Sequence, residues 1–128
     1  MNPDRVSELR GAQQKYILSK TEMEDKVDAG IWIRNVLEHF KGDILQLAKT
    51  SDKENTPSWE KMSQRLTGKT TTSIECSEMI KQKVEWKRLH EELTKIAKNP
   101  KYAKNANLEI IWIEFIDHLF IVLGLINL

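Results

Sequence analysis

The residues of this chain best suited to chemistry are acids in the apolar segment 108–128. Within IIWIEFIDHLFIVLGLI the only ionisable side chains are Glu114, Asp117 and His118. At about 100° per residue these three side chains share one sector of a helix, while nearly every other position is apolar and the helix should be buried nearly all round. A carboxylate in such a helix costs several kcal/mol unless something positive meets it. The segment therefore predicts a cationic partner for its acids.

A second pair of acids, Glu75 and Glu78, lies in the segment TTSIECSEMIKQKVEWKRLHEELTKI. On a helical wheel both glutamates fall in the apolar sector that is expected to pack, which also holds Trp86, Leu89, Leu93 and Ile96. Four carboxylates on the inner faces of two helices would repel one another without divalent cations, and an all-oxygen ligand set suits Mg²⁺ or Mn²⁺ better than zinc. We therefore predict a metal site formed by Glu75, Glu78, Glu114 and Asp117.

The same spacing also has a purely structural interpretation. Glu-x-x-Glu arises often by chance in charged amphipathic helices, whereas Glu-x-x-Asp inside an apolar helix is rarer. In the structural interpretation, Glu114 and Asp117 pair with lysines or arginines of a neighbouring helix, and Glu75 and Glu78 lie at the edge of the packed face. The spacing alone leaves both interpretations open.

Length, charge and cysteine content restrict the class of protein. The 128 residues favour a single domain over residues 1–128, and 20 basic against 19 acidic residues give no basic patch for nucleic acid. The single cysteine, Cys76, excludes a disulfide within the chain and favours a reducing, cytoplasmic location. Two acids and a histidine in the middle of residues 110–126 argue against a membrane-spanning helix. The charged start MNPDRVSELRG lacks the apolar run of a secretory signal.

Few glycines, three prolines and long stretches with a period of 3.6 residues predict an all-α protein, a four- or five-helix bundle. The first helix is expected to begin at Asn2–Pro3–Asp4, to carry Met23 on its apolar face and to end at Asp28–Gly30. KNPKYAKNAN is expected to be a loop that makes its two flanking helices antiparallel. The later helices are predicted at residues 31–48, 58–68, 71–98 and 107–127.

The acidic motifs resemble those of the all-α nucleoside triphosphate pyrophosphatases, the superfamily of dimeric dUTPases and MazG-type enzymes. In the dimeric dUTPase branch, the second motif reads like ECAELI followed by a Trp-Lys pair; here IECSEMI is followed by Trp86–Lys87. The third motif reads like an asparagine, then IEIVD and an apolar run; here Asn107 precedes WIEFIDHLFIVLGL. The first motif carries a glutamine, for which AQQKYI offers Gln13, although Ile17 stands in place of the family's asparagine. The resemblance covers residues 71–128, with a weaker echo at residues 9–17.

This resemblance implies a Mg²⁺-dependent enzyme that hydrolyses a (deoxy)nucleoside triphosphate, such as dUTP, to the monophosphate and pyrophosphate. The four acids Glu75, Glu78, Glu114 and Asp117 would hold Mg²⁺, and Glu78 would act as the general base. Substrate contacts would come from Gln13 facing the nucleobase, Lys87 neutralising phosphate charge and Trp86, for which core packing is the favoured alternative.

A non-catalytic helical protein that binds another protein is the main alternative, for example an adaptor, a regulatory subunit or an immunity-type factor. A third possibility is a degenerate pyrophosphatase fold that has lost substrate binding. Under each of these, a helix that is apolar on nearly every side needs more partner surface than a small bundle offers. We therefore expect a homodimer or a larger assembly that buries part of Ile110–Leu125.

Overall fold

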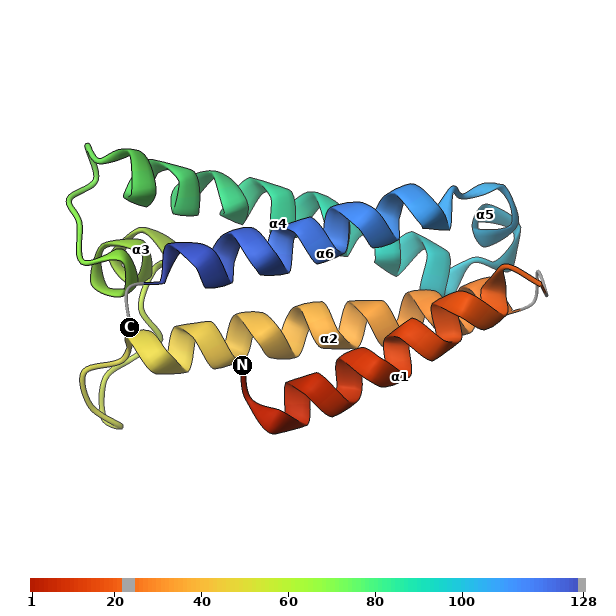
Figure 1. The fold of residues 1–128 in the computed structure, drawn as a ribbon, viewed down its shortest axis with the longest axis horizontal. Helices are drawn as coiled ribbons and strands as arrows, with labels where there is room; N and C mark the ends of the chain where they lie inside the picture. Colours follow the sequence, from red (N-terminus) through yellow and green to blue (C-terminus); the bar gives the residue numbers. More distant parts are fainter. Residues whose placement is uncertain (22–24, 127–128) are drawn as a thin grey trace.

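The computed structural model describes residues 1–21 and 25–126, which form six α-helices and no strand (Figure 1). The predicted all-α bundle is confirmed, and two of the six helices are short. None of the helices in the described residues is long and apolar enough to span a membrane. The helices are α1 (Pro3–Ser19), α2 (Asp25–Ala48), α3 (Trp59–Thr67), α4 (Ile74–Lys98), α5 (Pro100–Asn105) and α6 (Leu108–Leu125).

Four long helices lie side by side, with α3 closing one end of the bundle and α5 the other (Figure 1). Helix α2 packs against both α1 and α4, and α6 packs mainly against α4. Helices α1 and α2 run antiparallel, and so do α4 and α6, as predicted for the segments 71–98 and 107–127 (Figure 1). The last residue of the predicted helix 107–127 lies outside the described part of the chain.

Short polar residues begin the helices that carry the predicted acids. The Ser73 side chain accepts a hydrogen bond from the backbone N–H of Cys76 and caps α4, and the Asn107 side chain accepts one from Ile110 and caps α6. Asn99 both ends α4 and caps α5, where its side chain accepts from the N–H groups of Lys101 and Tyr102. Each cap supplies a partner to a backbone donor that the first helical turn leaves unsatisfied.

The predicted boundaries between the first helices are wrong. Helix α1 ends at Ser19, and the expected break at Asp28–Gly30 lies inside α2, which begins at Asp25; Met23 lies outside the described residues. Gly30 is fully packed: a Cβ atom there would lie 2.7 Å from Cγ2 of Ile96 on α4. This glycine therefore allows two helices to approach closely, a role that its sequence neighbourhood does not reveal.

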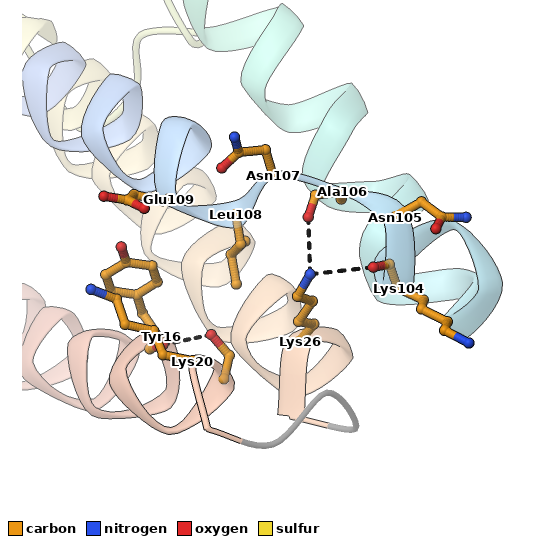
Figure 2. Close-up of a pocket in the computed structure, with 10 residues that line it drawn as sticks. Tyr16, Lys20, Lys26, Lys104, Asn105, Ala106, Asn107, Leu108 and Glu109 are labelled. Carbon is orange, nitrogen blue, oxygen red and sulfur yellow. Dashed lines mark hydrogen bonds between the residues drawn. The ribbon is translucent and has the colours of Figure 1, made fainter.

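The predicted loop KNPKYAKNAN is also wrong in part, because residues 100–105 form helix α5. Pro100 occupies the first turn, where its missing N–H costs nothing, and its fixed φ suits a helix start. Lys26 on α2 donates hydrogen bonds to the backbone carbonyls of Lys104 and Ala106, at 3.3 and 3.1 Å (Figure 2). This side chain connects α2 to the segment between α5 and α6.

Two tryptophans connect neighbouring helices through hydrogen bonds, of which that of Trp59 is buried and that of Trp86 is partly buried. The Trp59 indole N–H donates to the carbonyl of Met79 at 2.7 Å, and the Trp86 indole N–H donates to the carbonyl of Leu37 at 3.0 Å. Because each bond joins a side chain to a backbone on another helix, it fixes the relative position of the two helices as well as their packing. The core around them contains Ile33, Val36, Leu37, Phe40, Met79, Leu89, Leu93, Ile96, Phe115 and Leu119.

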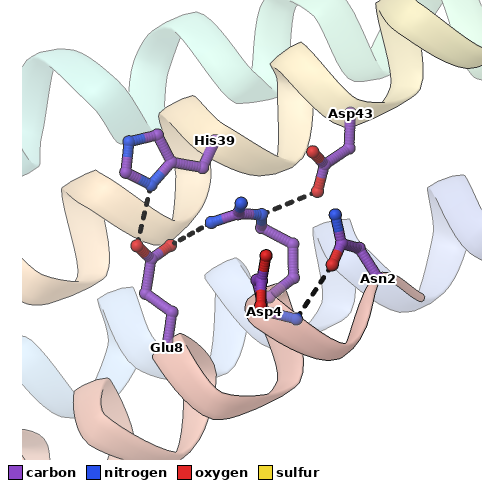
Figure 3. Close-up of polar contacts among 6 residues, drawn as sticks. Asn2, Asp4, Glu8, His39 and Asp43 are labelled. Carbon is purple, nitrogen blue, oxygen red and sulfur yellow. Dashed lines mark hydrogen bonds and ion pairs between the residues drawn. The ribbon is translucent and has the colours of Figure 1, made fainter.

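A polar network on the surface joins α1 to α2. Arg5 donates to Asp43 at 2.7 Å and to Glu8 at 3.1 Å, and Glu8 also lies 2.7 Å from Nδ1 of His39 (Figure 3). His39 is half exposed, with 51% of its side chain accessible. The network stabilises the packing of α1 against α2.

Candidate functional site

A groove of ≈ 340 Å³ between α4 and α6 is lined by four carboxylates. Three of them, Glu78, Glu114 and Asp117, belong to the predicted metal site, and the fourth is Glu85. Glu75 is exposed and is not among the residues that line the groove. Sequence reasoning missed Glu85, although its position two turns after Glu78 on the same helix places both on the side of α4 that meets α6.

Arg88 on α4 neutralises part of this acidic groove. Its guanidinium pairs with both Glu85 and Glu114, and its Nε lies 3.2 Å from a Glu85 oxygen. The hydrogen bonds that Arg88 donates to these carboxylates, first to Glu85 and then to Glu114, raise the pKa of Arg88 above its ordinary value. Glu114 therefore has the arginine partner on a neighbouring helix that the structural interpretation of the sequence expected.

Behind the carboxylates, Gln82 joins Glu78 to the buried His118. The Gln82 amide nitrogen lies 3.3 Å from a Glu78 oxygen, and the amide oxygen lies 2.8 Å from Nδ1 of His118. Because a carboxylate can only accept, the amide nitrogen of Gln82 faces Glu78. The amide oxygen of Gln82 must then accept a hydrogen bond from Nδ1–H of His118. This assigns the Nδ1–H tautomer to His118.

His118 is 1% exposed, and its Nε2 has no hydrogen-bond partner among the described residues. Burial lowers the pKa of His118 to about 4, against the smaller opposing effect of the Glu85 charge. The imidazole is therefore neutral at physiological pH, and the ring of Phe40 packs against it edge-on. His118 is thus a neutral core histidine whose Nδ1 is hydrogen-bonded and whose Nε2 lacks a partner among the described residues.

As arranged, the predicted acids are not gathered into one metal-binding cluster. Within residues 1–21 and 25–126, no three His, Cys, Asp or Glu side chains converge closely enough to hold a metal. The physical reason is visible in the partners: Glu114 and Glu85 face the Arg88 guanidinium, and Glu78 faces Gln82 and lies 4.0 Å from the Lys81 ammonium. A cation at this place would compete with side chains that already satisfy the carboxylates.

The predicted substrate-binding residues do not line the acidic groove. Gln13 is exposed on α1, and Lys87 is exposed on α4. The Trp86 indole is engaged in packing: besides its bond to α2, the Lys41 ammonium lies 4.1 Å from its ring centre and His90 stacks on it at 4.8 Å. Trp86 thus has the packing role that the sequence favoured over base stacking.

The structure differs most from the sequence prediction in the exposure of apolar side chains on α6. This helix was predicted to be buried nearly all round, yet Ile110, Ile113 and Phe120 are 51%, 52% and 69% exposed. With Asp117 and Gly124, these residues follow a spacing of 3, 4, 3 and 4, which places them on one stripe. We call residues 110, 113, 117, 120 and 124 the outer stripe of α6. On a helical wheel it lies opposite the buried residues Phe115, Leu119 and Val122, and Asp117 at its edge also lines the groove beside α4.

A second cavity, of ≈ 480 Å³, opens beside the outer stripe where α1 begins and α6 ends. Phe40, Ile44 and Leu47 of α2 and Leu123 of α6 give it an apolar lining, and Met1 and Asn2 form its rim on the α1 side. We call this cavity the apolar pocket. Asp43, which also lines it, is paired with Arg5 (Figure 3).

A third cavity, of ≈ 560 Å³, lies where α1 ends and α6 begins and is lined by three lysines, Lys20, Lys26 and Lys104 (Figure 2). Lys26 is engaged with two backbone carbonyls, and the Lys20 ammonium lies 4.9 Å from the ring centre of Tyr16. Lys104 extends away from Lys26, and Glu109 adds a negative charge (Figure 2). Two of the three lysines are thus engaged within the chain, and the lysine content of this cavity does not by itself predict an anion site.

Comparisons with known protein families, with curated proteins and with solved structures found no match for this chain. The function is therefore argued from the groove, the outer stripe and the apolar pocket.

Proposed function

We propose that this protein is a helical protein-interaction module that binds a partner protein through the outer stripe of α6. The observation that carries the proposal is the exposure of Ile110, Ile113 and Phe120 on one helix face. Exposed apolar side chains that gather on one helix face often mark a binding surface, and a stripe with heptad spacing suits the apolar face of another helix. A cytoplasmic location remains compatible with the single, buried Cys76 thiol.

The charges around the stripe support a specific partner. Asp117 is exposed in the middle of the stripe, between Ile113 and Phe120. A carboxylate at such a position costs affinity for a purely apolar helix and favours one with a basic residue at the matching place. The adjacent acidic groove adds to this preference, because Arg88 neutralises only part of its charge.

The proposal is tested by site-specific photo-crosslinking in the cell of origin. A photo-reactive amino acid at Ile113 should give a protein adduct identifiable by mass spectrometry, whereas the same group at Glu91, exposed on α4, should give none. Ile110→Glu, one turn away on the stripe, should reduce the adduct at position 113. Equal labelling at both positions, or none at position 113, would contradict the proposal.

A nucleoside triphosphate pyrophosphohydrolase is the second candidate. It is favoured by the resemblance of the motifs and by one specific observation, that three of the four predicted acids share one groove. The test is release of pyrophosphate from a panel of nucleoside triphosphates, dUTP included, with Mg²⁺ present. Release that disappears in Asp117→Asn, but persists in a matched Glu91→Gln variant, would establish this candidate in place of a binding module. Silence across the panel would exclude turnover.

A further inference from the structure

The C-terminal half of α6 carries an apolar projection and a matching pocket within one surface. Phe120 is 69% exposed, although aromatic side chains gain most from burial. Leu123, three residues later on the same helix, lines the apolar pocket. A pocket of ≈ 480 Å³ is of the size that accommodates small organic molecules, so a phenyl ring fits into it.

We infer that the C-terminal half of the outer stripe binds a second copy of this chain, with Phe120 of each copy seated in the apolar pocket of the other. The inference rests on the proposed function in that both use the outer stripe of α6. It identifies the partner for residues 120–126 and leaves Ile110, Ile113 and Asp117 for another protein. Because Phe120 lies within one helical turn of the pocket-lining Leu123, one twofold axis can satisfy both contacts at once.

An antiparallel pair of α6 helices gives the required register. If the twofold axis passes between residues 121 and 122, Phe120 of one copy faces Leu123 of the other. Gly124 lies on the same stripe, and no described atom lies within 4 Å of where its Cβ would be, so the helices can approach closely there.

The same register separates the charges. Each Asp117 lies about 4.5 residues from the axis, so at 1.5 Å rise per residue the two carboxylates are about 14 Å apart along the helices. This exceeds the Debye length of about 8 Å at physiological ionic strength, and their repulsion is largely screened. A register centred on Asp117 itself would bring the two charges together and is disfavoured.

The exposed apolar side chains can supply the centre of an interface, and the polar residues around them would supply the rest of its area. A phenylalanine side chain supplies about 150–250 Å² when it is fully buried, and a standard interface needs about 800 Å² from each copy. At the rim of the pocket, Leu47 is 60% exposed and Met1 is 47% exposed. Together with Phe120 these side chains form an apolar centre of the kind around which stable interfaces are built.

Sedimentation velocity with the protein at tens of micromolar tests the inference. Two variants that introduce opposite charges on the two sides of the proposed contact are compared with wild type. Wild type should sediment as a dimer, at twice the 14.9 kDa chain mass. Phe120→Lys and Leu47→Glu should each weaken the dimer by at least about 30-fold, the loss typical of a central residue. An equimolar mixture of the two variants should dimerise again, because a lysine then enters a pocket with a glutamate while the unaltered pair forms the second contact.

Two controls keep the test decisive. Val84→Lys, at a 72% exposed position on α4, should remain a dimer, and unchanged helical circular dichroism should show that every variant folds. A wild-type monomer, or a mixture of folded variants that stays monomeric, would overturn the inference. If wild type is monomeric while the crosslinker at Ile113 still labels a protein, the inference fails and the proposed function stands; if neither occurs, both fail.

Discussion

Lowering the pH from 7 to 5 should destabilise this protein through His118. The ring is 1% exposed, and burial lowers its pKa from 6.5 to about 4. Because the folded pKa is depressed, the unfolded chain takes up a proton first, and the free energy of unfolding falls as pH drops from 6.5 toward 4. At 1.36 kcal/mol per pKa unit the full loss is about 3 kcal/mol, and about 2 kcal/mol of it falls between pH 7 and pH 5.

Urea unfolding followed by circular dichroism at pH 7 and pH 5 measures this loss, and His118→Asn provides the reference. The asparagine amide can still donate toward Gln82, but it cannot titrate, so the variant should lose about 2 kcal/mol less than wild type over this range. Its lower stability at pH 7, caused by the smaller side chain, does not enter the difference, and the carboxylates contribute equally to both proteins. The same pH dependence in both proteins, or an imidazole that titrates near 6.5 by NMR, would refute the reasoning.

Three further predictions concern the packing of Gly30, the hydrogen bond of Trp59 and the ion pair of Arg88. Gly30→Ala should lower the free energy of unfolding by about 1–3 kcal/mol, because the added Cβ would meet Ile96. Gly42→Ala in the same helix, where no described atom of a neighbouring element lies within 4 Å of the added Cβ, should instead raise the free energy of unfolding by up to about 1 kcal/mol. Chemical denaturation of both variants measures these changes. Trp59→Phe should cost about 1–3 kcal/mol, since it removes the buried hydrogen bond to the Met79 carbonyl and part of a buried ring. An unchanged melting midpoint would contradict this. Arg88→Gln should lower the free energy of unfolding by no more than about 1 kcal/mol, because the Arg88–Glu114 ion pair lies at a half-exposed site. Lys87→Gln removes the same charge from the neighbouring position and serves as the control. A larger stability difference between the two variants in urea would mean that the groove depends on the Arg88–Glu114 pair.

Periodicity predicted the helices well because it depends on local geometry, but it could not predict contacts between helices. Gly30 looks like a helix end in the sequence, and only the closeness of Ile96 on α4 explains it as an internal packing position. Glu114 and Asp117 were correctly placed on one side of α6, yet the partner of Glu114 depends on the register between α4 and α6. No pattern within one helix contains that register, so Arg88 could not be assigned as the cation that meets the acids.

The composition of α6 can now be related to its position in the bundle. Because α6 packs mainly against α4, only one side of it is covered: Phe115, Leu119 and Val122 are buried, whereas Phe120, on another side, is 69% exposed. Glu114 and Asp117 lie at the boundary between these sides, where Arg88 reaches Glu114 at modest desolvation cost. The exposed apolar side has no such explanation within one chain. An uncovered apolar surface lowers solubility, so the outer stripe is best explained by binding to another protein surface.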